Sequence, residues 1–120
     1  MNWTTVSIIA AVILAILLLK NAGQISVKDA LTHLKNGALV IDVRSAAEFS
    51  SGHLPTAINI PTEELESVLP TLVKDKDEVL LLHCLSGTRS GMAKRKLKGL
   101  GYTNVFNLGS FARARKIVGQ

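Results

Sequence analysis

The sequence predicts an α/β fold in which a parallel sheet is flanked by helices and preceded by one apolar helix at the N-terminus. Three observations carry this prediction. First, 120 residues, 48% of them hydrophobic, suffice for one domain with its own core, which excludes a disordered chain. Second, from residue 38 onward short apolar runs alternate with helical segments of about ten residues, as in the crossover units of a parallel sheet. Third, residues 3–19 contain 14 apolar side chains and no charge.

The N-terminal segment, residues 1–24, is interpreted as a transmembrane helix followed by a short polar linker. Its 17 apolar-rich residues would span about 25 Å, the short end of what crosses a bilayer. Trp3 is an interfacial residue type, and Lys20 can extend its ammonium group to the headgroups. A cleaved signal peptide is less favoured, because no basic side chain precedes the apolar run. Lys20, Lys28 and Lys35 follow it, so we expect a single-pass protein of the inner or cell membrane with its domain in the cytoplasm.

Residues 25–120 predict the folded domain. Two capping boxes, each a serine followed three residues later by an acidic residue, start helices at Ser26 and Ser45. Glycines end these helices at Gly37 and Gly52. The apolar segments that follow them predict two strands and a further helix, at residues 38–43, 57–60 and 62–69.

The second half of the domain begins after a charged turn at residues 74–77. Residues 79–83, four apolar residues followed by His83, predict a strand buried on both faces. A loop at residues 84–89 leads into a helix expected from about residue 90 to 98, which Gly99 and Gly101 end. A last strand and a last helix are expected at residues 105–108 and 111–118.

Charge is unevenly distributed along the chain. The last 42 residues carry a net charge of +8 and the first 78 carry −3. A basic half of this kind suits an anionic substrate, acidic lipid or nucleic acid. We do not expect nucleic acid, because no aromatic platform accompanies the basic run at residues 94–98. That run is most simply a solvated face, and near a membrane it could also contact acidic lipid.

The loop after the third predicted strand carries the candidate chemistry. Cys84 is the only cysteine, which excludes an intrachain disulfide, and it stands between a buried strand and the start of a helix. Ligand sites in open α/β sheets lie at this end of the strands. The helix N-terminus, amides curled inward at Gly87, and the charge of Arg89 would each favour the thiolate. A buried structural cysteine is the alternative, and the Gly-x-Arg-Ser context before a helix argues against it.

Several motifs in a fixed order resemble the single-domain rhodanese-like sulfurtransferases. The motifs are VIDVR at residues 40–44, EF at 48–49, GHLPTAINIP at 52–61, C-x-x-G-x-R-S at 84–90 and LGY-x-x-V at 100–105. Together they cover nearly all of residues 25–120. Any one of them alone would be a weak signal.

This resemblance implies a rhodanese-like domain at residues 25–120 and sulfur transfer through a persulfide on Cys84. The thiolate would take the outer sulfur of a small anionic donor such as thiosulfate, and cyanide or a thiol from outside the chain would accept it. The residues expected to bind the donor are Arg44, Leu85, Ser86, Gly87, Thr88, Arg89 and Ser90. No cofactor or metal is expected, since the histidines and the cysteine lack ligand spacing.

Alternatives remain at the level of activity. Four residues separate Cys84 from Arg89, whereas phosphatases that resemble this family have one more, in a wider loop, so sulfur transfer is favoured over phosphate or arsenate chemistry. The other alternative is a membrane-tethered binding or redox-sensing module on an inactive rhodanese fold. Two departures from the family bear on this choice. The loop side chains are uncharged, and Gly109-Ser110-Phe111 stands where the family has two glycines followed by tryptophans.

Some neighbouring residues have two interpretations. Arg44 could bind the donor or brace the loop together with Asp42, for which the structural role is favoured. Glu48 is more simply a helix cap than a general acid. His53, in a turn, and His83, on an apolar strand, are interpreted as structural histidines.

Overall fold

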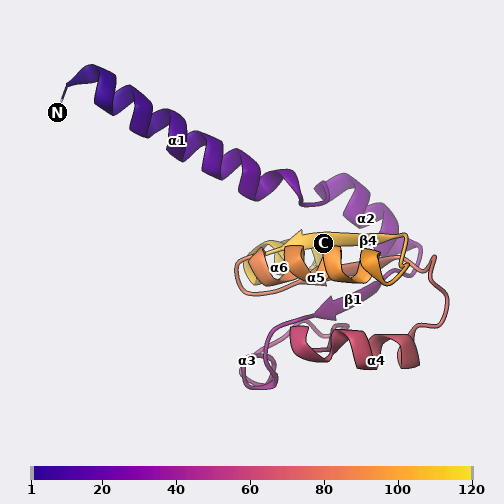
Figure 1. Ribbon diagram of the computed structural model, residues 1–120. Helices are drawn as coiled ribbons and strands as arrows, with labels where there is room; N and C mark the ends of the chain where they lie inside the picture. Colours follow the sequence, from indigo (N-terminus) through magenta and orange to yellow (C-terminus); the bar gives the residue numbers. More distant parts are fainter. Residues whose placement is uncertain (1, 120) are drawn as a thin grey trace.

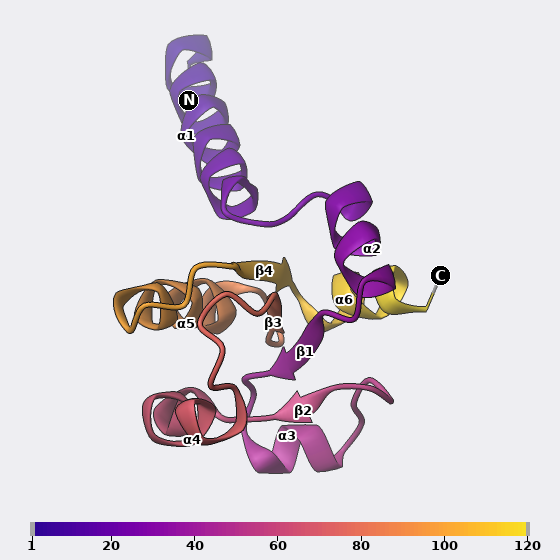
Figure 2. The same ribbon diagram turned by 90° about the vertical axis from the view of Figure 1, so that its right-hand side faces the viewer.

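A parallel sheet forms the centre of the molecule (Figures 1 and 2). The computed structural model describes residues 2–119, with the side chains of residues 2–18 and 23–119. Within this part of the chain the sheet has four strands in the order β2-β1-β3-β4, and all neighbours run parallel. The strands are β1 (Leu39–Asp42), β2 (Ile58–Asn59), β3 (Leu80–His83) and β4 (Val105–Gly109). The predicted parallel sheet is confirmed.

Helices cover both faces of the sheet, as predicted. They are α2 (Val27–Lys35), α3 (Ala46–Ser50), α4 (Leu65–Leu72), α5 (Thr88–Gly99) and α6 (Phe111–Val118). Leu82 of β3 belongs to a buried cluster with Leu69 of α4 and residues of α5. Its neighbour Leu81 belongs to a second cluster with Ala30 of α2 and residues of α6. Successive side chains of β3 therefore pack against helices on opposite faces of the sheet, which explains why Leu80, Leu81 and Leu82 are all apolar.

Several element boundaries differ from the predictions. The strand β2 has only two residues, and a 3₁₀ turn, η1 (Thr62–Glu64), precedes α4. Pro70 lies inside α4 rather than after it, and the helix ends two residues later at Leu72. A proline so close to the end of a helix removes one amide donor without interrupting a long hydrogen-bond ladder. The helix α5 begins at Thr88, because Gly87 takes the left-handed conformation that allows the chain to turn there.

The N-terminal helix α1 (Trp3–Ala22) projects away from the domain (Figure 1), and its apolar side chains are exposed where they are described. Within residues 2–119 no helix combines the length and the hydropathy needed to cross a membrane. This finding contradicts the predicted single-pass membrane location, and it gives no support to the membrane anchor or to the membrane as a partner. The physical reason is length. The uninterrupted apolar run, residues 8–19, has 12 residues, about 18 Å of helix against about 30 Å of hydrocarbon.

Two expectations were inferred from the anchor and lose that basis with it. They are the cytoplasmic orientation of the domain and the contact of the basic run at residues 94–98 with acidic lipid. The anchoring role expected of the Lys20 ammonium group lies outside the described side chains.

Candidate active site

Cys84 directly follows β3, at the carboxyl-terminal edge of the sheet. Its side chain is fully buried, and its amide donates to the carbonyl of Gly109 at the end of β4 (3.2 Å). The chain then curls back, so that the amide of Gly87 donates to the Cys84 Sγ at 3.0 Å. Gly87 has a φ of 96°, and a Cβ placed on it would lie 3.3 Å from the backbone of Gly109. Glycine is therefore required at this position both for its backbone conformation and for space.

The pKa of Cys84 results from two opposing effects. Burial, the larger single effect, raises it, because a thiolate loses its solvation inside a protein. The hydroxyl of Ser90 and the amides of Ser90, Gly87 and Ser86 together outweigh burial, and the pKa of Cys84 lies below its ordinary value of 9.0. The anion is stabilised by hydrogen bonds from the loop and the first turn of α5.

Arg89 is held by Glu48 of α3. Its guanidinium donates to both carboxylate oxygens of Glu48, at 2.7 and 3.0 Å. The hydrogen bonds from Arg89, assisted by the amide of Ser45, lower the pKa of Glu48 from its usual 4.5 to about 2. Glu48 also completes the predicted capping box with Ser45, so one carboxylate both caps α3 and binds the guanidinium. The Glu48 carboxylate partly neutralises the charge of Arg89, so this charge has a weaker electrostatic effect on the Cys84 thiol.

Arg44 is almost completely buried and is directed toward Asp42. Two of its guanidinium nitrogens donate to the Asp42 carboxylate at 2.8 to 3.0 Å, and Nη2 also donates to the carbonyl of Gly52 at 2.7 Å. The guanidinium lies 4.4 Å from the centre of the Phe111 ring. These contacts tie the ends of β1, α3 and α6 together. They match the bracing interpretation of Asp42 and Arg44.

The remaining side chains of the loop are uncharged and point outward. Leu85 is 57% exposed, and Ser86 and Thr88 are exposed beside it. The carbonyl of Leu85 accepts from the amide of Phe111 at 3.2 Å, which attaches the loop to the start of α6. Ser90 is buried and lies 3.5 Å from the sulfur, so it is the loop hydroxyl that can act on the thiol directly.

Both histidines near the loop make structural contacts. His83 is fully buried, and burial above all lowers its pKa, which keeps the ring neutral. Its Nδ1 lies 3.4 Å from the carbonyl of Cys84, and among the described residues its Nε2 has no hydrogen-bond partner. His53 stacks on Phe49 at a centroid distance of 3.8 Å and shares a 2.8 Å hydrogen bond with its carbonyl.

Sequence reasoning did not identify Asn107 of β4. This side chain is buried and makes hydrogen bonds to Ser90 in the first turn of α5, to Gly87 just before that helix, and to Gly109 at the end of β4. The available signal was a lone polar residue inside the apolar strand predicted at residues 105–108. A buried amide in a core strand needs partners, and these partners belong to the site.

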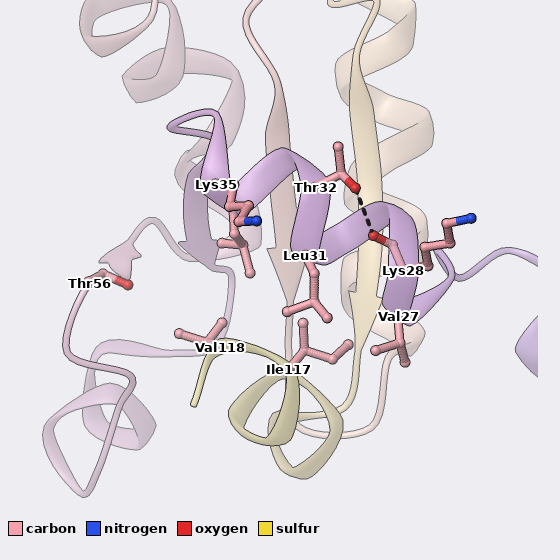
Figure 3. A pocket seen from close by; sticks show the side chains of 9 residues that line it. Val27, Lys28, Leu31, Thr32, Lys35, Thr56, Ile117 and Val118 are labelled. Carbon is pink, nitrogen blue, oxygen red and sulfur yellow. Dashed lines mark hydrogen bonds between the residues drawn. The ribbon is translucent and has the colours of Figure 1, made fainter. Parts of the chain in front are cut away.

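A groove outside this site lies between α2 and α6 (Figure 3). Val27, Leu31 and Ile117 line it, with the ammonium groups of Lys28 and Lys35 at its edge. No residue of the Cys84 loop contributes to this groove. The candidate chemistry therefore belongs to the end of the sheet and not to the groove.

A parallel α/β sheet with loop amides directed at a buried cysteine defines a class of domains built around a cysteine nucleophile. Residues 26–113 match the family model described as "Rhodanese-like domain". The chain therefore belongs to the rhodanese-like family, and its parallel sheet flanked by helices is the rhodanese-like fold.

Named relatives include sulfurtransferases. The chain is 41% identical over 69 residues to thiosulfate sulfurtransferase PspE of Escherichia coli, which covers 58% of this chain and 66% of that protein. Among solved structures, "rhodanese with anions from E. coli" is 36% identical, with a TM-score of 0.62 over 64% of this chain and 91% of the other. The human single-domain sulfurtransferase TSTD1 is 29% identical, with a TM-score of 0.66 over 78% and 96%. These relatives support sulfur transfer in general terms.

Proposed function

We propose that this protein is a sulfurtransferase that carries a sulfane sulfur as a persulfide on Cys84. The observation that carries the proposal is the convergence of hydrogen-bond donors on one sulfur atom. The amide of Gly87 lies 3.0 Å from Sγ, and the loop donors together lower the pKa of Cys84. A thiolate is the nucleophilic form of cysteine, and preorganised donors stabilise negative charge on sulfur during the reaction.

The reaction has two displacement steps. The Cys84 thiolate attacks the outer sulfur of a donor such as thiosulfate. A bond forms between Sγ and that sulfur, the donor's S–S bond breaks, and sulfite leaves with the electron pair. A thiolate or cyanide acceptor then attacks the outer sulfur of the persulfide, and the Cys84 thiolate leaves. Because Cys84 is the only cysteine, the acceptor comes from outside this chain.

We assign different roles to the other site residues. The backbone of Leu85, Ser86, Gly87 and Thr88 forms the ring around the transferred sulfur, and Ser90 supplies a hydroxyl to it. Arg89 favours an anionic donor, with its charge moderated by Glu48. In this proposal Arg44 acts through its neighbours and holds the loop from the side of β1.

Intact-mass measurement after incubation with thiosulfate tests the proposal. We expect a gain of one sulfur atom that cyanide or a thiol removes. Cys84→Ser is the matched control, because it changes one atom at the proposed nucleophile and leaves no other cysteine. An unmodified mass after treatment with thiosulfate and with a small-molecule persulfide would contradict the proposal, provided that circular dichroism shows a folded domain.

The complete burial of the Cys84 side chain favours a second candidate function, that of a binding or redox-sensing domain without catalytic activity. Alkylation of Cys84 by iodoacetamide as a function of pH separates the two. A thiol that ionises near 9.0 and reacts slowly at neutral pH supports the binding domain. A midpoint clearly below that value supports the sulfurtransferase.

A further inference from the structure

The side chain of Asn107 lies between the end of β4 and the first turn of α5. It is 4% exposed. Its Oδ1 accepts from the hydroxyl of Ser90 at 2.7 Å and from the amide of Gly109 at 2.9 Å. Its Nδ2 donates to the carbonyl of Gly87 at 3.1 Å. Three of its bonds therefore end on residues that surround the sulfur, although Asn107 itself makes no hydrogen bond to Cys84 within the described structure.

Each of these three partners in turn holds Cys84. The amide of Gly87 donates to Sγ at 3.0 Å, and the hydroxyl of Ser90 lies 3.5 Å from it. The carbonyl of Gly109 accepts from the amide of Cys84 at 3.2 Å. The Cys84 loop and α5 are continuous in sequence, whereas Asn107 belongs to the neighbouring strand β4. The side-chain amide of Asn107 therefore connects β4 to the loop and to the start of α5.

We infer that Asn107 is a positioning residue that holds the loop donors on the Cys84 sulfur. The inference rests on the proposed function, because it assigns Asn107 to the activation of the proposed nucleophile. Its action is indirect. Without the bond to the Gly87 carbonyl, the turn at Gly87 loses its link to the sheet and its amide is free to leave the sulfur.

Gln24 and Ile25 lie against Asn107 and help to bury it. Gln24 pairs with Asn107 as an isolated parallel bridge, and the amide of Ile25 donates to the Asn107 carbonyl at 2.9 Å. The side-chain amide of Gln24 lies against Gly87 and Gly109, where an added Cβ would come within 3.1 and 2.8 Å of its Nε2. Burial under this segment strengthens the hydrogen bonds of Asn107, because water cannot compete for them.

Ser90 makes the test of this inference more specific. Its hydroxyl has one proton and three acceptors within reach: Asn107 Oδ1 at 2.7 Å, the Gly87 carbonyl at 3.2 Å and Sγ at 3.5 Å. Removing Asn107 therefore leaves that proton to be shared between the sulfur and the Gly87 carbonyl, while the bond from Nδ2 to Gly87 is lost. The two effects on the thiol oppose each other. In Ser90→Ala the hydroxyl is absent, and a second substitution at Asn107 then reports on its bonds to Gly87 and Gly109.

The experiment measures the alkylation rate of Cys84 by iodoacetamide against pH in the full chain. In the Ser90→Ala background, we expect Asn107→Leu to raise the midpoint further by about one pKa unit, since it weakens a hydrogen bond to an anion. At pH values below both midpoints the alkylation rate falls about tenfold. Asn104→Leu in the same background is the matched control. Its Nδ2 also donates to a backbone carbonyl, that of Asp77 at 2.7 Å, at the opposite end of the sheet.

Each outcome has a defined meaning. A midpoint in Ser90→Ala/Asn107→Leu equal to that of Ser90→Ala overturns the inference, and so does an equal rise in the Asn104 control. If wild-type Cys84 itself ionises near 9.0, the proposed function fails instead, whatever Asn107 does. Thermal unfolding checks that the variants fold. Asn107→Ala, a smaller side chain with the same predicted rise, decides the question if leucine does not fit.

Discussion

The two ends of the sheet use the same kinds of hydrogen bond to different effect. At the amino-terminal end, Asn104 donates to the carbonyl of Asp77 at 2.7 Å, and the Tyr102 hydroxyl donates to that of Val73 at 2.7 Å. At the carboxyl-terminal end, Asn107 also donates to a carbonyl, that of Gly87. The amide of Gly87, however, donates to the Cys84 sulfur. Both ends are stabilised by their side chains. The carboxyl-terminal end alone combines a helix N-terminus with a left-handed glycine, which directs donors at one atom.

The largest difference between the two ends should appear when a carboxylate is neutralised. Asp42→Asn leaves the buried guanidinium of Arg44 without its counter-charge, and we expect a loss of about 3 kcal/mol in the free energy of unfolding. Asp77, at the amino-terminal end, is exposed and accepts from Thr103 at 2.7 Å. Asp77→Asn should change the free energy of unfolding by no more than about 0.5 kcal/mol. Urea unfolding measures both, and equal losses would show that burial of the first pair does not matter.

Two glycines with similar backbone angles sharpen the comparison. Gly87 and Gly101 have φ values of 96° and 99°, but only an added Cβ at Gly87 meets neighbours, whereas the space at Gly101 is open. Gly101→Ala should cost about 1 kcal/mol from its backbone angle and leave the thiol unchanged. Gly87→Ala should cost more and should raise the pKa of Cys84, because its amide is displaced from the sulfur. Unfolding and alkylation of the two variants check this, and a thiol unaffected in Gly87→Ala would contradict it.

The smallest expected effect concerns pH. The pKa of Glu48 is lowered to about 2, so its pairing with Arg89 stabilises the folded state fully above the unfolded value of about 4.5. This contribution is lost as the pH falls through about 2. We expect acid to weaken wild type more than Glu48→Gln across that range. Urea unfolding between pH 5 and pH 2 measures the difference, and parallel curves for the two proteins would contradict the assignment.

Local patterns predicted much of the fold. The capping box of Ser45 and Glu48 is present as expected, because its groups lie within one turn of helix. The strands β1 and β3 were predictable from nearly continuous apolar runs, since both of their faces are covered. Pro70 was misread as a helix end, because its cost depends on how many residues of helix follow it. The apolar N-terminal segment was misread as a membrane anchor, because composition was weighed over the length of the uninterrupted run.

By itself the sequence determined the order of strands and helices, the family, and the position of a cysteine at the start of a glycine-containing loop. These properties depend on neighbours along the chain and on motif order. Only the tertiary structure decided the partners of the charged and polar groups. Arg89 binds Glu48, which lies 41 positions before it in the chain, and Asn107 binds Gly87, which lies 20 positions before it. Such pairs form because the carboxyl ends of β1, β3 and β4 lie at the same edge of the sheet. Local sequence patterns do not predict which residues meet there.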